Sequence, residues 1–345
     1  MAEAADPKLR PMLQSMVFGF FPSQVLYVGA RLRIPDLVAD GAKTSEELAD
    51  ATGTHAPTLY RLLRALAYLG VLQEKEADRF GLTELGSLLR SDAPDSMWAS
   101  TLLFCGEGSW KAWGDLLTSV RTGEPTFERG SGEEPFQRFA DDPEASAQFN
   151  QAMSEGTRRD APGIVASYDF AQFQTLVDVG GGDGTLLAAI LRATPGLHGV
   201  VFDIPSGLAQ ATKTLEAAGV GARGQIVEGD VFQSAPDGAD GYIMKSVIHD
   251  WDDDQCVTIL NNCRAAMADG AKVLIVEPVL PPTVEPSFTR LGVIMSDLNM
   301  LLNTGGRERT EPEFAALLES AGLRLASVVP LPKPSVYSII EAVAA

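Results

Sequence analysis

The sequence predicts an α/β protein with a doubly wound, mostly parallel sheet that follows a smaller helical region. From about residue 173 onward, short apolar strands alternate with helical patterns, as in sheets with helices on both faces. The first of these strands, 175–179, runs straight into a glycine-rich turn and then an apolar helix from Leu186. Open α/β sheets bind their ligands at such a turn. The expected strands are 175–179, 199–203, 224–228, 240–246 and 272–277.

The last two strand-like segments are expected to pair with each other in antiparallel fashion. They span 323–329 and 335–342, and only the five residues 330–334 join them. A link this short allows a hairpin but cannot hold the crossover helix that parallel pairing requires. The predicted sheet therefore ends in an antiparallel C-terminal hairpin.

Residues 1–100 are expected to form a separate helical domain. Two helices and a β-ribbon, formed by 71–75 and 79–83, follow one another in a winged-helix pattern. One interpretation of this pattern is a DNA-binding domain, which would contact DNA through its second helix, where Arg61 and Arg64 lie. A packing and dimerisation role fits better, because two arginines are weak support in so acidic a chain.

Composition limits the possible partners. The 345 residues suggest two domains, or one large domain with an extension. A formal net charge of −19 argues against nucleic acid, which needs a basic face. The chain has no 18-residue apolar run and no basic, apolar leader, so neither a membrane span nor a secretory signal is expected. The three cysteines form no CxxC pair, which argues against zinc and fits a reducing cytoplasm. Cys256 and Cys263 lie seven residues apart on one face of an expected helix, and we expect them to pack as small buried apolar groups.

The region 101–165 is expected to be a helical linker that contributes to a substrate pocket. Aromatic side chains gather in and just before it, and at such density they are usually core, although a pocket for a flat ligand is the alternative. These residues are Trp98, Phe104, Trp110, Trp113, Phe127, Phe136, Phe139, Phe149 and, beside them, Met153.

The glycine-rich turn indicates S-adenosylmethionine as the ligand. A dinucleotide fingerprint would need a third glycine where the chain has Thr185, and no P-loop lysine follows. Asp178 and Asp183 flank the turn, which suits a pyrophosphate poorly but suits an ammonium, a sulfonium and a ribose. A tight strand-to-helix turn that binds nothing is the alternative.

Polar residues at the next strand ends extend this interpretation. Asp203 ends the second strand about 20 residues later, where such sites hold a ribose, although it could instead cap the following helix. Asp230 can accept from an adenine amine while Val231 and Phe232 pack on the ring. Lys245 either binds the ligand's carboxylate or is a solvated charge.

His249 follows the fourth strand and is the candidate general base. Removing the proton of a hydroxyl acceptor is a common task of a positioned imidazole. A phenol near pKa 10 and a histidine near 6.5 differ by roughly 3.5 units, or about 5 kcal/mol. A carboxylate on the ring would raise its basicity, and Glu277 and Glu308 are the two candidates. The alternative is a loop histidine that only caps neighbouring backbone.

Three consecutive acids, 252–254, are compatible with a magnesium site. We expect instead that they cap the helix that follows them and favour its positive end.

Together these residues resemble the small-molecule O-methyltransferase family, which includes plant caffeate and flavonoid enzymes and bacterial polyketide enzymes. The match covers roughly residues 15 to 345, and 120–145 match least. Five segments carry it: 176–185, 202–205, 229–232, 249–251 and 305–310.

The resemblance implies a Rossmann-like class I methyltransferase domain over 166–345, after the dimerisation domain 1–100 and the linker 101–165. It implies a homodimer that converts S-adenosylmethionine to S-adenosylhomocysteine without a metal, on the hydroxyl of a small aromatic molecule. Methylation of a nitrogen or a carboxylate is one alternative, and a winged-helix regulator that senses a ligand is another. The implied catalytic residues are His249, Glu277 and Glu308; the cofactor residues are Asp178, Gly180, Gly182, Asp203, Ile204, Asp230, Val231, Phe232 and Lys245; the acceptor residues are Met153, Trp251, Met295, Asn299 and Met300.

Overall fold

The computed structural model describes residues 6–126, 142–286 and 291–345. The chain divides into two compact units, Met1–Trp110 and Lys111–Ala345. Three aromatics expected in that region, Phe127, Phe136 and Phe139, lie outside the described residues. Among the residues described, none of the helices combines the length and apolar character needed to cross a bilayer.

The N-terminal unit is helical, with a small antiparallel sheet in the order β1-β3-β2. Leu59, Leu63 and Leu66 recur at helical spacing along one side of α5 and are buried in its core. The two-helix and ribbon order is present, and the ribbon gains a two-residue strand, β1, that the sequence did not predict. The elements are α1 (Leu9–Val17), α2 (Phe20–Arg31), α3 (Ile34–Leu37), β1 (Lys43–Thr44), α4 (Ser45–Thr52), α5 (Ala56–Tyr68), β2 (Leu72–Glu76), β3 (Arg79–Leu82), α6 (Glu84–Ser87), α7 (Trp98–Phe104) and α8 (Glu107–Gly114), which runs past the unit boundary.

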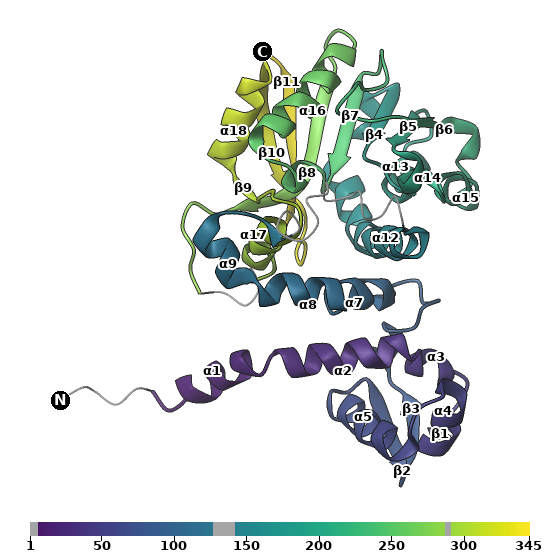
Figure 1. The fold of residues 1–345 in the computed structure, drawn as a ribbon. Coiled ribbons are helices and arrows are strands. Elements are labelled where there is room, and N and C mark those ends of the chain that lie inside the picture. The colour runs from purple at the N-terminus through teal and green to yellow at the C-terminus, as the bar shows by residue number, and fades with distance from the viewer. Residues whose placement is uncertain (1–5, 127–141, 287–290) are drawn as a thin grey trace, which may run out of the picture. The chain divides into compact units, whose positions relative to one another are not determined.

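An eight-stranded sheet forms the centre of the second unit, in the order β10-β11-β8-β7-β4-β5-β6, with β9 paired to β8 (Figure 1). The five predicted parallel strands are all present, and the C-terminal hairpin is antiparallel as predicted. The strands are β4 (Thr175–Val179), β5 (His198–Asp203), β6 (Gly224–Glu228), β7 (Gly241–Lys245), β8 (Lys272–Leu280), β9 (Arg309–Thr310), β10 (Leu323–Pro330) and β11 (Tyr337–Ala344).

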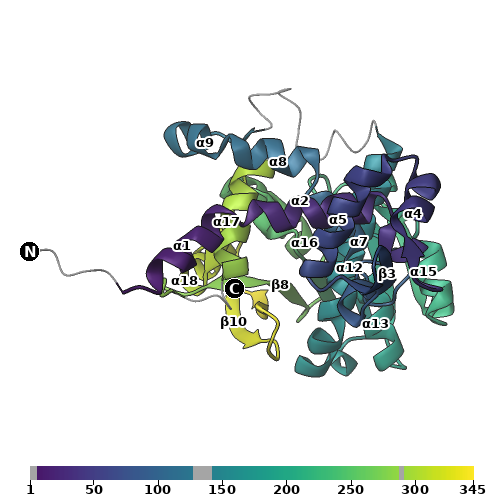
Figure 2. The same cartoon turned by 90° about the horizontal axis from the view of Figure 1, so that it is seen from below.

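Helices cover both faces of this sheet, as Figures 1 and 2 show. Successive strand residues point to opposite faces, so Val177 joins the core under α16 and α18, whereas Leu176 joins the core under α12 and α13. Both cores are apolar, which explains why the strands read as continuous hydrophobic runs. The helices are α9 (Leu116–Thr122), α12 (Pro143–Ser167), α13 (Thr185–Ala193), α14 (Pro205–Leu208), α15 (Ala211–Ala217), α16 (Asp253–Ala266), α17 (Leu291–Asn303) and α18 (Glu311–Ser320), with short 3-10 turns at Phe170–Gln172, Gly221–Arg223 and Ile248–Asp250.

Candidate active site

The glycine turn after β4 has the backbone that the sequence predicted. Gly180, Gly182 and Gly184 have φ values of 66°, 55° and 76°, a region that side chains rarely tolerate. A Cβ on Gly180 would lie 2.8 Å from the Val247 side chain, whereas a Cβ on Gly182 would meet nothing within 4 Å. Gly180 therefore lets the turn pack against the segment that carries His249, and Gly182 leaves open space at the sheet edge.

Asp178 lies beneath this turn and is 2% exposed. Its Oδ2 atom is buried without a hydrogen-bond partner among the described residues. Burial, reinforced by the nearby Asp203, raises the pKa of Asp178 to about 7. A buried carboxylate without a partner gains free energy from a cation, so the site fits a ligand that carries an ammonium or sulfonium.

Asp203, at the end of β5, holds the turn in place. Its Oδ2 accepts from the Gly182 N–H at 2.8 Å and its Oδ1 accepts from the Ile204 N–H at 2.7 Å. Each oxygen keeps a second lone pair, so a ribose hydroxyl can still donate to it. The N-cap position of helix α14 is Ile204, and no side chain accepts from the first N–H groups of this helix. The alternative that Asp203 caps this helix therefore has no support.

After β6, Asp230 is exposed, and its Oδ1 accepts from the Phe232 N–H at 2.9 Å. Phe232 is partly buried and meets Trp251 edge-on, with 4.8 Å between ring centroids and 88° between planes. Trp251 was expected to face the acceptor, and in the structure its ring lies beside a residue assigned to the cofactor.

The Lys245 side chain, at the end of β7, is 8% exposed, which argues against the solvated-charge alternative. Its ammonium lies 3.7 Å from the Asp160 carboxylate and 4.6 Å from the centre of the Tyr337 ring. Asp160 comes from α12 and is itself only 4% exposed. Sequence reasoning missed Asp160, because no local pattern links a helical acid to a lysine 85 positions later.

His249 lies in the 3-10 turn after β7 and is 8% exposed. Its Nδ1 is 3.0 Å from Glu308 Oε1, which also accepts from the Ser296 hydroxyl at 2.7 Å. The pairing leaves Nε2 available, with the Asp250 carboxylate 3.8 Å away. Each ring nitrogen thus has an acid beside it. The sequence analysis did not predict that Asp250 and Ser296 belong to this site.

Glu277 contacts the backbone of the same turn and not the imidazole ring of His249. Its Oε1 accepts from the N–H groups of Val247 and His249, each at 3.1 Å. Burial raises the pKa of Glu277, whose side chain is 0% exposed. Oε2 atoms of both Glu277 and Glu308 are buried without a partner among the described residues.

These carboxylates change the basicity of His249. Burial alone would lower the pKa of the imidazole, but three acids outweigh it and raise the pKa to about 10. The charge of Asp250 is the largest single cause of this rise; the hydrogen bond to Glu308 and the charges of Glu277 and Glu308 follow.

The acidic run at 252–254 acts as expected in capping α16. Asp252 accepts from the Gln255 N–H at 2.8 Å in a capping box, and Asp253 pairs with Arg307 and Arg309. Among the described residues, no group of three or more His, Cys, Asp or Glu side chains could hold a metal ion. Cys256 and Cys263 are both buried, as predicted.

The residues expected at the acceptor differ in exposure. Met295 on α17 is 36% exposed, and Asn299, one turn later, accepts from the Trp113 indole N–H at 3.1 Å. Met300 is only 9% exposed, and Met153 on α12 is partly buried. Their contact with an acceptor stays a prediction.

Two family models match the chain. An O-methyltransferase dimerisation domain matches residues 14–92, and an O-methyltransferase domain matches residues 113–324. The chain belongs to this O-methyltransferase family. As a member it is a methyltransferase that uses S-adenosylmethionine, and the fold is that of class I methyltransferases.

Individual relatives agree with this assignment along the whole methyltransferase. A phenazine O-methyltransferase of Lysobacter antibioticus is 45% identical over 334 residues, 97% of this chain and 96% of the relative. The 8-amino-8-demethylriboflavin N,N-dimethyltransferase of Streptomyces davaonensis is 38% identical over 322 residues, which are 92% of this chain and 90% of the relative.

Solved structures agree as well. The crystal structure of LaPhzM superposes with a TM-score of 0.93 at 44% identity, covering 98% of this methyltransferase and 99% of that chain. An O-methyltransferase from neocarzinostatin biosynthesis, solved with S-adenosylmethionine and 2-hydroxy-5-methyl naphthoic acid, gives 0.79 at 36% identity, covering 94% and 96%.

Proposed function

We propose that this methyltransferase methylates a hydroxyl group on an aromatic small molecule, with His249 as the general base. The observation that carries the proposal is the buried His249–Glu308 pair, at 3.0 Å, at the end of β7 beside the predicted cofactor strands. When bound, S-adenosylmethionine supplies an electrophilic sulfonium methyl group. Asp178, Gly182 and Asp203 would hold it, since they offer an unpaired buried carboxylate, open backbone and free lone pairs.

The raised basicity of His249 supports a phenolic acceptor. Proton transfer from a phenol near pKa 10 to an ordinary histidine is uphill by roughly 3.5 units. A pKa of about 10 for His249 removes most of that difference. The carboxylates around the ring thus bring the basicity of the neutral imidazole close to that of a phenolate. Only the neutral ring can take the proton, so activity should rise toward alkaline pH. Relatives whose names include a phenazine or a naphthoic acid ligand support an aromatic acceptor.

The test is release of S-adenosylhomocysteine with a panel of phenols and hydroxylated polycyclic aromatics. We expect turnover with at least one class, and a loss of about 10²- to 10⁴-fold for His249→Ala. His198→Ala is the matched control, because His198 is exposed at the start of β5. Full activity of His249→Ala on a phenol would remove the general-base assignment.

Methylation of an aromatic amine is the second candidate, favoured by the N,N-dimethyltransferase relative. A neutral amine attacks without prior loss of a proton, so His249→Ala would keep its activity on anilines. The same panel with amines in place of hydroxyls separates the two functions.

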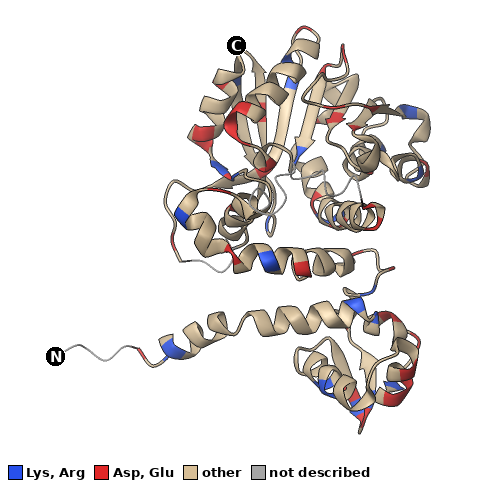
Figure 3. Ribbon diagram, viewed as in Figure 1, with Lys and Arg blue, Asp and Glu red and all other residues tan. Residues whose placement is uncertain are grey.

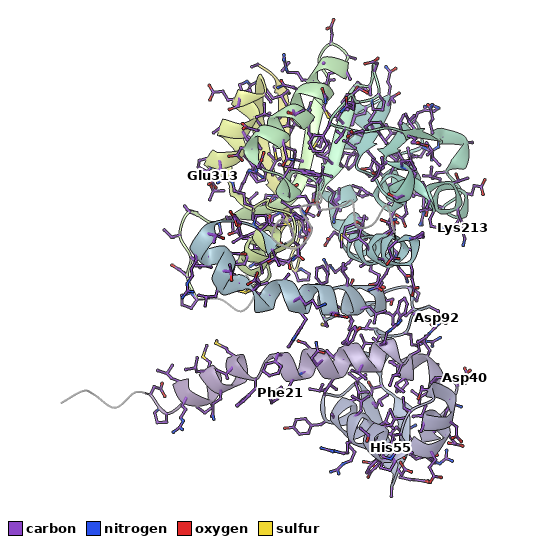
Figure 4. All side chains as sticks on the ribbon, viewed as in Figure 1. Phe21, Asp40, His55, Asp92, Lys213 and Glu313 are labelled. Carbon is purple, nitrogen blue, oxygen red and sulfur yellow. The ribbon has the colours of Figure 1, made fainter. Side chains whose placement is uncertain are left out.

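We also propose that the protein works as a homodimer through α1 and α2. Both helices present large apolar side chains to solvent within their unit, and α2 carries almost no charge along its length (Figure 3). Exposed apolar area of this extent marks an interaction surface, and this segment overlaps the dimerisation domain match. The side chains are Leu9, Met12, Leu13, Met16, Val17, Phe18, Phe20 and Phe21, of which Figure 4 labels Phe21.

Light scattering after gel filtration tests the dimer. Leu13→Asp and Phe21→Asp should give monomers, whereas Tyr68→Asp, 92% exposed on α5, should remain a dimer. An unchanged mass for the double variant Leu13→Asp/Phe21→Asp would show that this face is not the interface.

A further inference from the structure

One short segment, Gly306–Arg309, contacts the turn that carries His249 at three points. It leads into β9, which pairs with β8 two residues after Glu277 through Val279 and Arg309. The pairing fixes the segment to the sheet, so its position relative to the turn is set by backbone hydrogen bonds. Glu308 provides one contact, to the imidazole. The other two contacts involve only the backbone of the turn.

Arg309 makes the second contact and is completely buried, at 0% exposure. Its guanidinium donates to the carbonyls of Ile248 and Trp251, at 3.1 Å each. It also donates twice to Asp253 Oδ1, at 3.1 and 2.7 Å. A planar fork suits this task because one rigid group reaches three acceptors in fixed directions. Its acceptors lie on both sides of His249 in the chain.

Gly306 makes the third contact, by close approach of backbone to backbone. A Cβ on this residue would lie 2.0 Å from the His249 carbonyl oxygen and 2.5 Å from the Asp250 carbonyl carbon. No side chain fits there, so the segment lies directly on the turn. On the other side, Glu277 holds the N–H groups of Val247 and His249. The turn is therefore held by a buried anion through its N–H groups and by a buried cation through its carbonyls.

We propose that Arg309 is a positioning residue for His249, with Gly306 as the second part of the same device. This inference rests on the proposed role of His249 as base. Arg309 touches neither ring nitrogen and acts by fixing the carbonyls on either side of His249, so that the ring meets Glu308 at Nδ1 and presents Nε2 to the acceptor. A displacement near 1 Å at a catalytic group can cost on the order of 10²-fold in rate.

A double-mutant cycle between Arg309→Lys and His249→Ala tests the inference. Lysine keeps the charge but lacks the fork, so Arg309→Lys should lower kcat at least about tenfold, with KM for S-adenosylmethionine within threefold of wild type. In the His249→Ala background it should lower kcat no further. Arg307→Lys is the matched control. Arg307 donates to the other oxygen of Asp253 at 2.8 Å, but its side chain is 46% exposed, and within the described part of the chain it donates to no carbonyl of the turn. An equal loss in both backgrounds would overturn the inference.

Two readouts other than turnover separate positioning from stability. Binding of S-adenosylhomocysteine by calorimetry should be unchanged in Arg309→Lys. The chain has only three histidines, so NMR titration can follow His249, and its pKa should fall by at least one unit as the ring leaves Glu308. If Arg309→Lys does not fold, Asp253→Asn should lower kcat and the His249 pKa in the same direction, because it weakens the half-exposed carboxylate that holds the guanidinium and adds no atom to the core. An unchanged His249 pKa in both variants would refute the inference even if His249 proves not to be the base.

Discussion

Replacing Glu308 by glutamine should shift the pH dependence of methyl transfer toward lower pH. The amide still accepts a hydrogen bond from Nδ1, 3.0 Å away in the wild type, so the position of the ring is kept while one negative charge is removed. Glu308 is one of the three acids that raise the pKa of His249 to about 10. The His249 pKa must therefore fall in the variant.

The expected fall in the His249 pKa is set by what the variant keeps. Burial still opposes protonation of the ring, while Glu308, which acts both through its hydrogen bond and through its charge, is lost. We expect the His249 pKa to fall by about one unit, or roughly 1.4 kcal/mol of basicity. Because only part of that basicity is expressed in the transition state, the rate at the alkaline plateau should fall by roughly three- to tenfold.

The sign of the effect depends on pH. The base must be unprotonated, so kcat/KM rises with pH and levels off above the His249 pKa. Near pH 7.5 the variant has about ten times more neutral imidazole than wild type, which offsets its weaker basicity, and the two rates should be close. Near pH 10 the variant should be clearly slower.

The assay is a profile of kcat/KM between pH 6 and pH 10.5 with one phenolic acceptor, together with NMR titration of His249. Glu313→Gln is the control, since Glu313 (labelled in Figure 4) caps α18 and is not among the acids that raise the pKa of His249. The reasoning is refuted if the Glu308→Gln profile superposes on the wild type, or if its apparent pKa rises.

Three further predictions concern the cofactor edge. Asp178→Asn should raise the unfolding midpoint at pH 8. The pKa of Asp178 is raised to about 7 in the folded protein, so its contribution to stability is fully present below the ordinary pKa near 3.8 and is lost as the pH rises through 7. Removing the charge at pH 8 should therefore stabilise the fold by at most about 4 kcal/mol, while calorimetry should show that binding of S-adenosylmethionine is lost. Gly182→Ala should weaken binding of S-adenosylmethionine and lower the melting temperature modestly, because an alanine at φ 55° is strained even in open space. Gly180→Ala should lower the melting temperature further, since its Cβ also meets Val247. Asp160→Asn should lower the free energy of unfolding, measured by urea titration, by about 3–5 kcal/mol, because it leaves the buried Lys245 without its partner. Asp92→Asn, at a more exposed ion pair, should lower it by only about 0–1 kcal/mol. Equal losses would show that burial does not strengthen the Asp160–Lys245 pair.

The sheet could be predicted closely because its signals are local. Strands β4 and β6 begin and end where the sequence indicated, since each is a short apolar run followed by glycine or acid. The two-residue strand β1 was missed, because Lys43–Thr44 carries no hydrophobic pattern and pairs only through its backbone. The hairpin was predicted from the length of its link, a constraint that tertiary packing cannot change.

The site was predictable only in part, and topology explains the division. Parallel strands bring all their carboxyl ends to one edge, so the acids after β4, β5 and β6 could be grouped without knowing any contact. The contacts that hold Lys245 and the His249 turn come from other elements. Asp160 on α12 lies beside Lys245, and Arg309 on β9 donates to a carbonyl of the His249 turn. Nothing in a sequence marks an arginine as completely buried, since arginine is mostly exposed. Ion pairs and hydrogen bonds from crossing elements fix the geometry of such a site, so the arrangement of this edge depends on residues that strand patterns leave unassigned.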